Sequence, residues 1–140
     1  MAPIRLTSEP QASLNDVQSI RDRLDQFNVD VTGENNYSPI RIFLRDETNK
    51  LVGGLLAEIW AGWIHIEFLW IDEPFRHNGF ATQLLQAAEA EARQKNCTDV
   101  HLETFSFQAR PFYERFGYKV FAELPDFPPG QTFYFLRKTL

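Results

Sequence analysis

The chain has 140 residues, of which 44% are hydrophobic and 14% aromatic, a composition that supports one sizeable core and excludes an intrinsically disordered chain. A net charge of -5 argues against a nucleic-acid partner, because such surfaces need clustered Lys and Arg. The lone Cys97 excludes an internal disulfide, no stretch is long and apolar enough to span a membrane, and the N-terminus lacks the apolar core of a signal peptide. We therefore expect a cytoplasmic protein with one domain over residues 1–140 and no nucleic-acid or membrane partner.

The first half of the chain predicts a helix and three strands. Apolar residues at helical spacing indicate a helix over 12–27, and a loop rich in Asn, Gly and Pro follows. Apolar runs at 40–46 and 51–60 flank a polar turn, which predicts an antiparallel hairpin, while Gly53 and Gly54 indicate a bulge or a close backbone approach. The run at 63–71 is apolar at nearly every position, as expected of a strand buried on both faces.

The second half predicts two helices and three strands. A helix over 80–95 and a strand over 99–107 are followed by a short helix with Pro111 in its first turn, and by strands at 119–126 and 131–140. The strand-helix-strand unit from 63 to 105 needs a crossover, so its two strands should be parallel neighbours. We expect an α+β fold, an α/β three-layer arrangement with a mixed, mostly antiparallel sheet and a central parallel strand pair. The C-terminal strand either closes the sheet or pairs with a second subunit, so a homodimer stays open.

The predicted helix at 80–95 begins without negative charge. No carboxylate occurs over residues 75–88, although helix starts usually carry one or a polar cap. The first amide groups of a helix and its dipole attract anions, Gly79 permits a close backbone approach, and Arg76 adds a positive charge. The segment is therefore either a phosphate or pyrophosphate site or a plain strand-to-helix turn.

Two motifs resemble those of a known family. The spacing Arg76-x-x-Gly79-x-Ala81 is similar to the Q/R-x-x-G-x-G/A signature of the GNAT superfamily, the Gcn5-related N-acetyltransferases, and "FQARPFYERFGY" resembles a second family stretch. The resemblance extends over residues 12–140. It implies acetyl-CoA as co-substrate, with its pyrophosphate on the loop at 76–82 and its pantetheine arm along the preceding strand. The implied cofactor-binding residues are Leu69, Ile71, Arg76, His77, Asn78, Gly79, Ala81 and Thr82.

The resemblance also implies a general acid. Tyr113 matches the family tyrosine that donates a proton to the departing coenzyme A thiolate, and a phenol with a pKa near 10 suits that task. The alternative is a half-buried helix aromatic with its hydroxyl in water.

Glu67 is the first choice for the base, and His65 is the second. Period-2 geometry places His65, Glu67, Leu69 and Ile71 on one face unless a bulge intervenes. A carboxylate in an apolar strand is costly unless it is paired or used, and burial raises its pKa towards values that suit a base. The alternative is a structural role, in which Glu67 pairs with an arginine or lies at a solvent-exposed edge of the sheet.

The neighbouring strand repeats the same alternation with His101 and Glu103. If the two strands are in register, these side chains form a polar cluster or a metal site with His65 and Glu67. We favour a hydrogen-bonded network of these side chains over a metal site, and the resemblance implies no metal.

The resemblance implies an acetyl-CoA-dependent N-acetyltransferase. We expect direct attack of a primary amine on the thioester in a ternary complex, with a small-molecule amine as partner. The alternative is a non-catalytic acyl-CoA-binding sensor module of the same fold. The identity of the acceptor, among small amines, antibiotics and protein amines, stays open.

Overall fold

The computed structural model describes residues 2–140, which form two compact units, one ending at Asn35 and the other spanning Asn36–Leu140. The first unit contains helix α1 (Leu14–Thr32), which starts at Ser13, whose side chain accepts a hydrogen bond from the amide of Asp16, and ends at Gly33 in the left-handed conformation. The helix is longer than expected, because the stop signal is Gly33 and the residues at 28–32 continue the helix. Within the described residues, no helix is long and apolar enough to cross a lipid bilayer.

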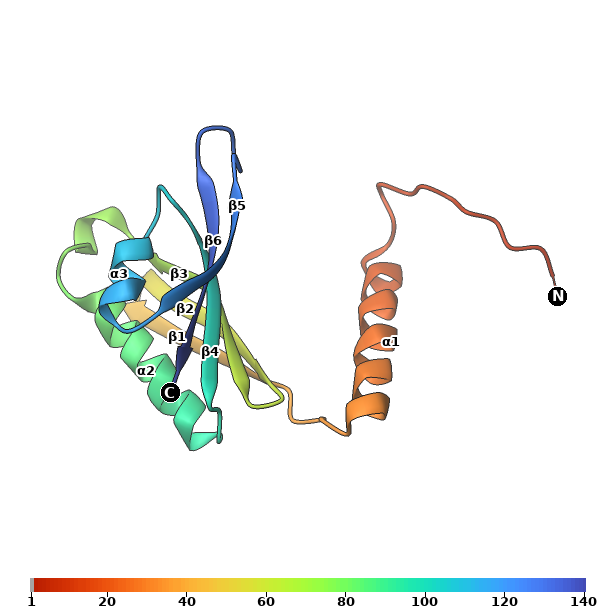
Figure 1. Ribbon diagram of the computed structural model, residues 1–140, viewed down its shortest axis with the longest axis horizontal. Helices are drawn as coiled ribbons and strands as arrows, with labels where there is room; N and C mark the ends of the chain where they lie inside the picture. Colours follow the sequence, from red (N-terminus) through yellow and green to blue (C-terminus); the bar gives the residue numbers. More distant parts are fainter. Residues whose placement is uncertain (1) are drawn as a thin grey trace. The chain divides into compact units, whose positions relative to one another are not determined.

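The second unit contains one mixed sheet of six strands (Figure 1). Its strands lie in the order β1-β2-β3-β4-β6-β5, and only β3 and β4 pair in parallel. In chain order the elements are β1 (Ser38–Arg45), β2 (Leu51–Trp60), β3 (Trp63–Ile71), the short 3-10 helix η1 (Glu73–Phe75), α2 (Phe80–Gln94), β4 (Asp99–Phe105), α3 (Arg110–Arg115), β5 (Lys119–Pro125) and β6 (Thr132–Thr139). The mixed α+β fold, the hairpin and the central parallel pair are confirmed.

Two strand expectations need correction. The C-terminal strand β6 is not an edge, because it inserts between β4 and β5, and β5 forms the edge instead. Strand β3 is not buried on both faces: Ile64 and Ile66 are in the core, whereas Phe68 and Trp70 are 63% and 59% exposed. The aromatic residues made the strand look continuously apolar, although exposed and buried residues alternate on either side of Glu67.

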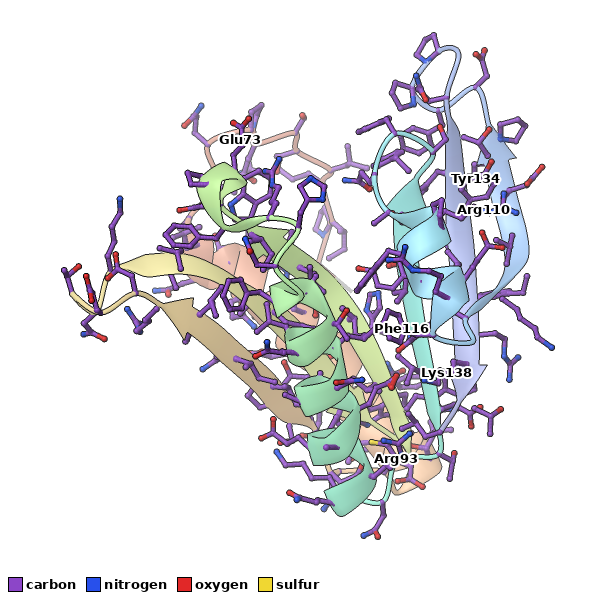
Figure 2. The ribbon with its side chains drawn as sticks, turned by 90° about the vertical axis from the view of Figure 1, so that its left-hand side faces the viewer. Glu73, Arg93, Arg110, Phe116, Tyr134 and Lys138 are labelled. Atoms are coloured by element: carbon purple, nitrogen blue, oxygen red, sulfur yellow. The ribbon has the colours of Figure 1, made fainter. Side chains whose placement is uncertain are left out.

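Helices α2 and α3 lie on the same face of the sheet (Figures 1 and 2). The core lies between them and the strands, and the predicted stripe of α2 is fully part of it, with Leu84, Leu85, Ala88 and Ala92 at most 4% exposed. Below, we call this side of the sheet the core face and the other side the open face.

A buried ion pair ties α2 to the sheet. Glu89 is 5% exposed and accepts hydrogen bonds from Lys138 Nζ on β6 at 2.9 and 2.8 Å and from Tyr118 Oη at 3.0 Å. Its charge and lone pairs are therefore satisfied, as a buried carboxylate requires.

The paired glycines of β2 reflect a close backbone approach. A Cβ atom at Gly53 would lie 2.7 Å from the carbonyl oxygen of Trp70, and one at Gly54 would lie 2.9 Å from that of Ile42. Any side chain at these two positions would push the neighbouring strands apart.

Candidate active site

The sheet opens between β3 and β4. These strands pair from Trp63 and Asp99 to Ile66 and Leu102, and no further pairs follow, so they diverge beyond that point (Figure 2). The pairing of β2 with β3 shifts at the same place, because Phe68 faces Leu56 whereas Ile66 faces Ala57. Glu67 is left without a partner in β2 and forms a bulge at the start of the gap.

A cleft of about 930 Å³ occupies this gap and is lined by residues of β3, β4, α2 and α3. It brings together nine of the eleven site residues expected from the sequence and leaves out His65 and Asn78. The nine are Glu67, Leu69, Ile71, Arg76, His77, Gly79, Ala81, Thr82 and Tyr113.

The start of α2 lines the cleft with free amide groups. Gly79 is the N-cap residue at φ 80, no side chain caps the helix, and the first turn carries no acidic residue. The preceding His77 is also in the left-handed region, at φ 62. A Cβ atom at Gly79 would meet nothing within 4 Å, so this position needs glycine for its conformation and not for space. The uncapped start can bind an anion.

The side chains of Arg76 and Asn78 shape this turn. Arg76 Nε donates a hydrogen bond to the carbonyl oxygen of Ile71 at 2.9 Å, and its guanidinium lies 4.7 Å from the ring centroid of Trp70. Asn78 Nδ2 donates to the carbonyl oxygens of Phe75 at 3.2 Å and Arg76 at 2.9 Å. Arg76 therefore ties the turn to the end of β3 while its positive charge remains beside the cleft.

The bulge at Glu67 changes which side chains share a face of β3. Leu69 and Ile71 pair with Leu55 and Gly53, and Ile71 belongs to the core, whereas His65 pairs with Glu58 on the open face. The expected common face for His65, Glu67, Leu69 and Ile71 is therefore wrong, because one extra residue inverts the alternation beyond it. Leu69 and Ile71 lie on the same side as α2, and His65 lies on the opposite side.

Tyr113 lies on the core face. It belongs to α3, whose first turn accommodates Pro111 as expected, and is 6% exposed. Its ring packs edge-on against Phe112 and Tyr118, at centroid distances of 5.1 and 5.7 Å. Burial raises the pKa of its hydroxyl to about 12. Tyr113 therefore stays protonated at neutral pH and can only donate a proton there.

Glu67 lies near other acidic groups at the cleft. The pKa of its carboxyl is raised, first by partial loss of solvent and then by the negative charge of Glu58. Tyr37 Oη donates a hydrogen bond of 2.5 Å to Glu58 Oε1, and this bond raises the pKa of Tyr37 to about 12. Glu58 therefore links an exposed tyrosine to the candidate base.

His65, His101 and Glu103 form the expected polar cluster. His65 faces His101 in register, their rings stack at 4.3 Å with an angle of 3°, and His65 Nε2 lies 2.7 Å from Glu103 Oε2. Burial, followed by the neighbouring His65, lowers the pKa of His101. Glu103 lines the cleft, so the cluster reaches the site through Glu103.

Sequence reasoning missed Glu58 and the aromatic side chains of the open face. Glu58 is the only carboxylate in the apolar run of β2, which is the same signal that drew attention to Glu67 in β3. Phe105, Phe107 and Phe133 also line the cleft. They looked like ordinary strand residues, but β4 ends at Phe105, so Phe107 lies in the turn that follows, and Phe105 meets Phe133 only because β6 pairs with β4.

Comparisons with known proteins agree with this geometry. The family model described as "Acetyltransferase (GNAT) family" matches residues 8–118. The chain is 41% identical over 95 residues to the blasticidin-S acetyltransferase of Streptomyces morookaense, covering 67% of this chain and 70% of that protein. It is 32% identical over 121 residues to an acetyltransferase of Agrobacterium fabrum, covering 86% and 88%.

Solved structures show the same fold. A crystal structure described as an acetyltransferase from Agrobacterium tumefaciens superposes with a TM-score of 0.91 and 29% identity, covering 98% of this chain and 100% of that one. An acetyltransferase from Bacillus cereus superposes with a TM-score of 0.83 and 29% identity, covering 96% and 98%. The chain belongs to the GNAT acetyltransferase family. The expected class, an acetyl-CoA-dependent acyltransferase, is thereby confirmed.

Proposed function

We propose that this protein transfers the acetyl group of acetyl-CoA to a primary amine of a small molecule, by direct attack in a ternary complex. The observation that carries the proposal is the single cleft that joins the uncapped start of α2, the carboxylate of Glu67 and the hydroxyl of Tyr113. Acetyl transfer from acetyl-CoA to an ammonium ion needs a site that binds the anionic donor, a base and an acid, and these three features supply them.

The donor binds along the core-face side of the cleft. The amides of the first turn of α2 and those at His77 and Gly79 receive the pyrophosphate, with Arg76, Asn78, Ala81 and Thr82 shaping this turn. Beyond Ile66 the edge of β3 that faces β4 has no strand partner, which supports binding of the pantetheine arm beside Leu69 and Ile71. Acetyl-CoA supplies the thioester that is cleaved.

The chemical step needs a base and an acid. Glu67 takes a proton from the acceptor ammonium, directly or through a water, and the free amine attacks the thioester carbonyl. The carbon–sulfur bond then breaks, and Tyr113 donates its proton to the departing thiolate. As the amide forms, its nitrogen releases a second proton to water, and water returns a proton to Tyr113, so no covalent enzyme intermediate is needed. His65 acts through its contact with Glu103 and is the second candidate for the base.

The acceptor we propose first is an antibiotic amine of the blasticidin S kind. The similarity to a blasticidin-S acetyltransferase extends over two thirds of this chain and supports a small-molecule acceptor.

Mass spectrometry of products tests this function. The protein is incubated with acetyl-CoA and, in turn, blasticidin S, an aminoglycoside, a polyamine, an amino acid and a short peptide. We expect mono-acetylated blasticidin S or another small amine. Acetylation of the peptide alone would overturn the small-molecule assignment, and a rise in melting temperature with acetyl-CoA but no acetylated product would favour a sensor.

A further inference from the structure

Four phenylalanine rings cluster at the open-face side of the cleft. Phe105 stacks on Phe107 with 5.2 Å between centroids at 9°, and on Phe133 at 4.5 Å and 21°. Phe127 meets the rings of Phe105 and Phe133 edge-on, at 5.5 and 5.4 Å. The result is a row of three nearly parallel rings, Phe107, Phe105 and Phe133, which we call the phenylalanine row.

The phenylalanine row does not serve the hydrophobic core. Its three rings lie outside the core cluster between the sheet and its helices, and Phe107, at the end of the row, is 58% exposed. Exposed aromatic groups that contact one another at a cleft are typical of binding surfaces. Since Phe107 is exposed and stacks within the row only on Phe105, it offers a position for another flat ring.

The row is next to the groups that handle the amine. Phe105, Phe107 and Phe133 line the same cleft as Glu67, Glu103 and Tyr113. Glu103 and Phe105 are two residues apart on β4, so their side chains lie on the same face of the strand. A ligand with its ammonium group at Glu67 or Glu103 would therefore place a neighbouring ring against the row.

We infer that the acceptor is a primary amine joined to a flat, unsaturated ring, which stacks on the phenylalanine row while the ammonium group is held by Glu67 and Glu103. This inference rests on the proposed function and specifies its acceptor. Charge complementarity directs the ammonium end to the carboxylates, and the parallel rings select a planar partner over a bulky aliphatic one.

A matched pair of amines tests the inference. Binding of 2-(naphthyl)ethylamine and of its fully saturated analogue, 2-(decahydronaphthyl)ethylamine, is measured by calorimetry on the protein loaded with coenzyme A, which has no acetyl group to transfer. The saturated amine is at least as hydrophobic but cannot stack. We expect the aromatic amine to bind about fivefold more tightly, as ring stacking in proteins allows.

Phe107→Leu keeps an apolar side chain but removes the ring, so the ratio of the affinities for the aromatic and the saturated amine should fall close to one. Phe43→Leu is the control, because Phe43 is 49% exposed on β1, contacts Arg45 and does not line the cleft. No binding of either amine, equal binding of both, or a preference that survives Phe107→Leu and Phe105→Leu would overturn the inference. Acetylation of amines without a ring preference would overturn this inference alone, whereas a ring preference with no acetylation of any amine would overturn the proposed function.

Discussion

Tyr113 and Glu67 line one cleft from opposite faces of the sheet. Tyr113 belongs to the core beneath α2 and α3, whereas Glu67 leaves β3 at a bulge and interacts with Glu58 on the open face. The two side chains can face a common ligand only because β3 and β4 diverge after Ile66 and Leu102. Donor and acceptor therefore meet in the gap of the sheet, with the acid on one side and the base on the other.

Replacing Tyr113 with Phe should lower the rate of acetyl transfer by about 10²-fold, because the thiolate loses its proton donor. The affinity for acetyl-CoA should change little, since the ring is retained. Initial rates of thiol release and a binding isotherm for acetyl-CoA measure the two effects. Tyr134→Phe is the matched control, because Tyr134 contacts Arg110 outside the cleft (Figure 2). Equal rates for wild type and Tyr113→Phe would contradict the acid assignment.

The dependence of kcat/KM on pH tests whether Glu67 is the base and whether Glu58 raises its pKa. A base must be deprotonated, so kcat/KM falls as pH decreases through the raised pKa of Glu67. Glu58→Gln removes a negative charge that raises this pKa, so the acidic limb should move to lower pH. On the alkaline side, Tyr113 imposes no loss until pH approaches its pKa of about 12.

Glu73→Gln is the control for this profile, because Glu73 lies exposed in η1 and its charge is not among those that shift the pKa of Glu67. If the acidic limb stays at the same pH in Glu58→Gln but disappears in Glu67→Gln, Glu67 is still the base and Glu58 does not influence its pKa. A limb unchanged in both variants would exclude Glu67 as the base.

A carboxylate at the start of α2 should separate helix stability from cofactor binding. In Thr82→Asp the new charge favours the helix dipole by about 0.5 kcal/mol, yet it repels the pyrophosphate, so the melting temperature should hold or rise while KM for acetyl-CoA increases. Thr82→Asn has nearly the same shape without the charge and should leave KM close to the wild-type value. If Thr82→Asp leaves KM unchanged, the pyrophosphate binds elsewhere.

The ion pair of Glu89 and Lys138 predicts a stability effect. Lys138→Met leaves the Glu89 carboxylate buried with only Tyr118 as partner, which should lower the free energy of unfolding by about 3 kcal/mol. Adding Glu89→Gln removes the unpaired charge and should restore part of the loss. Urea unfolding measures both variants, and additive losses in the double variant would show that the two side chains are not coupled.

The sequence predicted the elements well, because local signals determine them. Gly79, Pro111 and Gly117 each mark a turn or a helix end, and the stripe of small and apolar residues in α2 matched the core. The overrun of α1 past the expected end shows the limit of composition, since Asn and Asp within 28–32 were compatible with a helix until Gly33 ended it.

The sequence could not predict how the site is divided between the two faces. The bulge at Glu67 depends on how β2 and β3 pair, and alternation without a bulge placed Leu69 and Ile71 on the same face as His65. Phe105 and Phe133 are far apart in the chain and meet only because β6 inserts beside β4. The contact of Tyr37 with Glu58 likewise joins residues distant in the sequence. Each of these features arises from strand pairing, which local patterns do not encode.

The most direct test of direct transfer in the cleft measures the initial rate of thiol release while the concentrations of acetyl-CoA and of the acceptor amine are both varied. We predict that release requires the amine and that the double-reciprocal lines intersect, as expected when both substrates are bound before chemistry. Parallel lines, or release that is independent of the amine, would contradict the account.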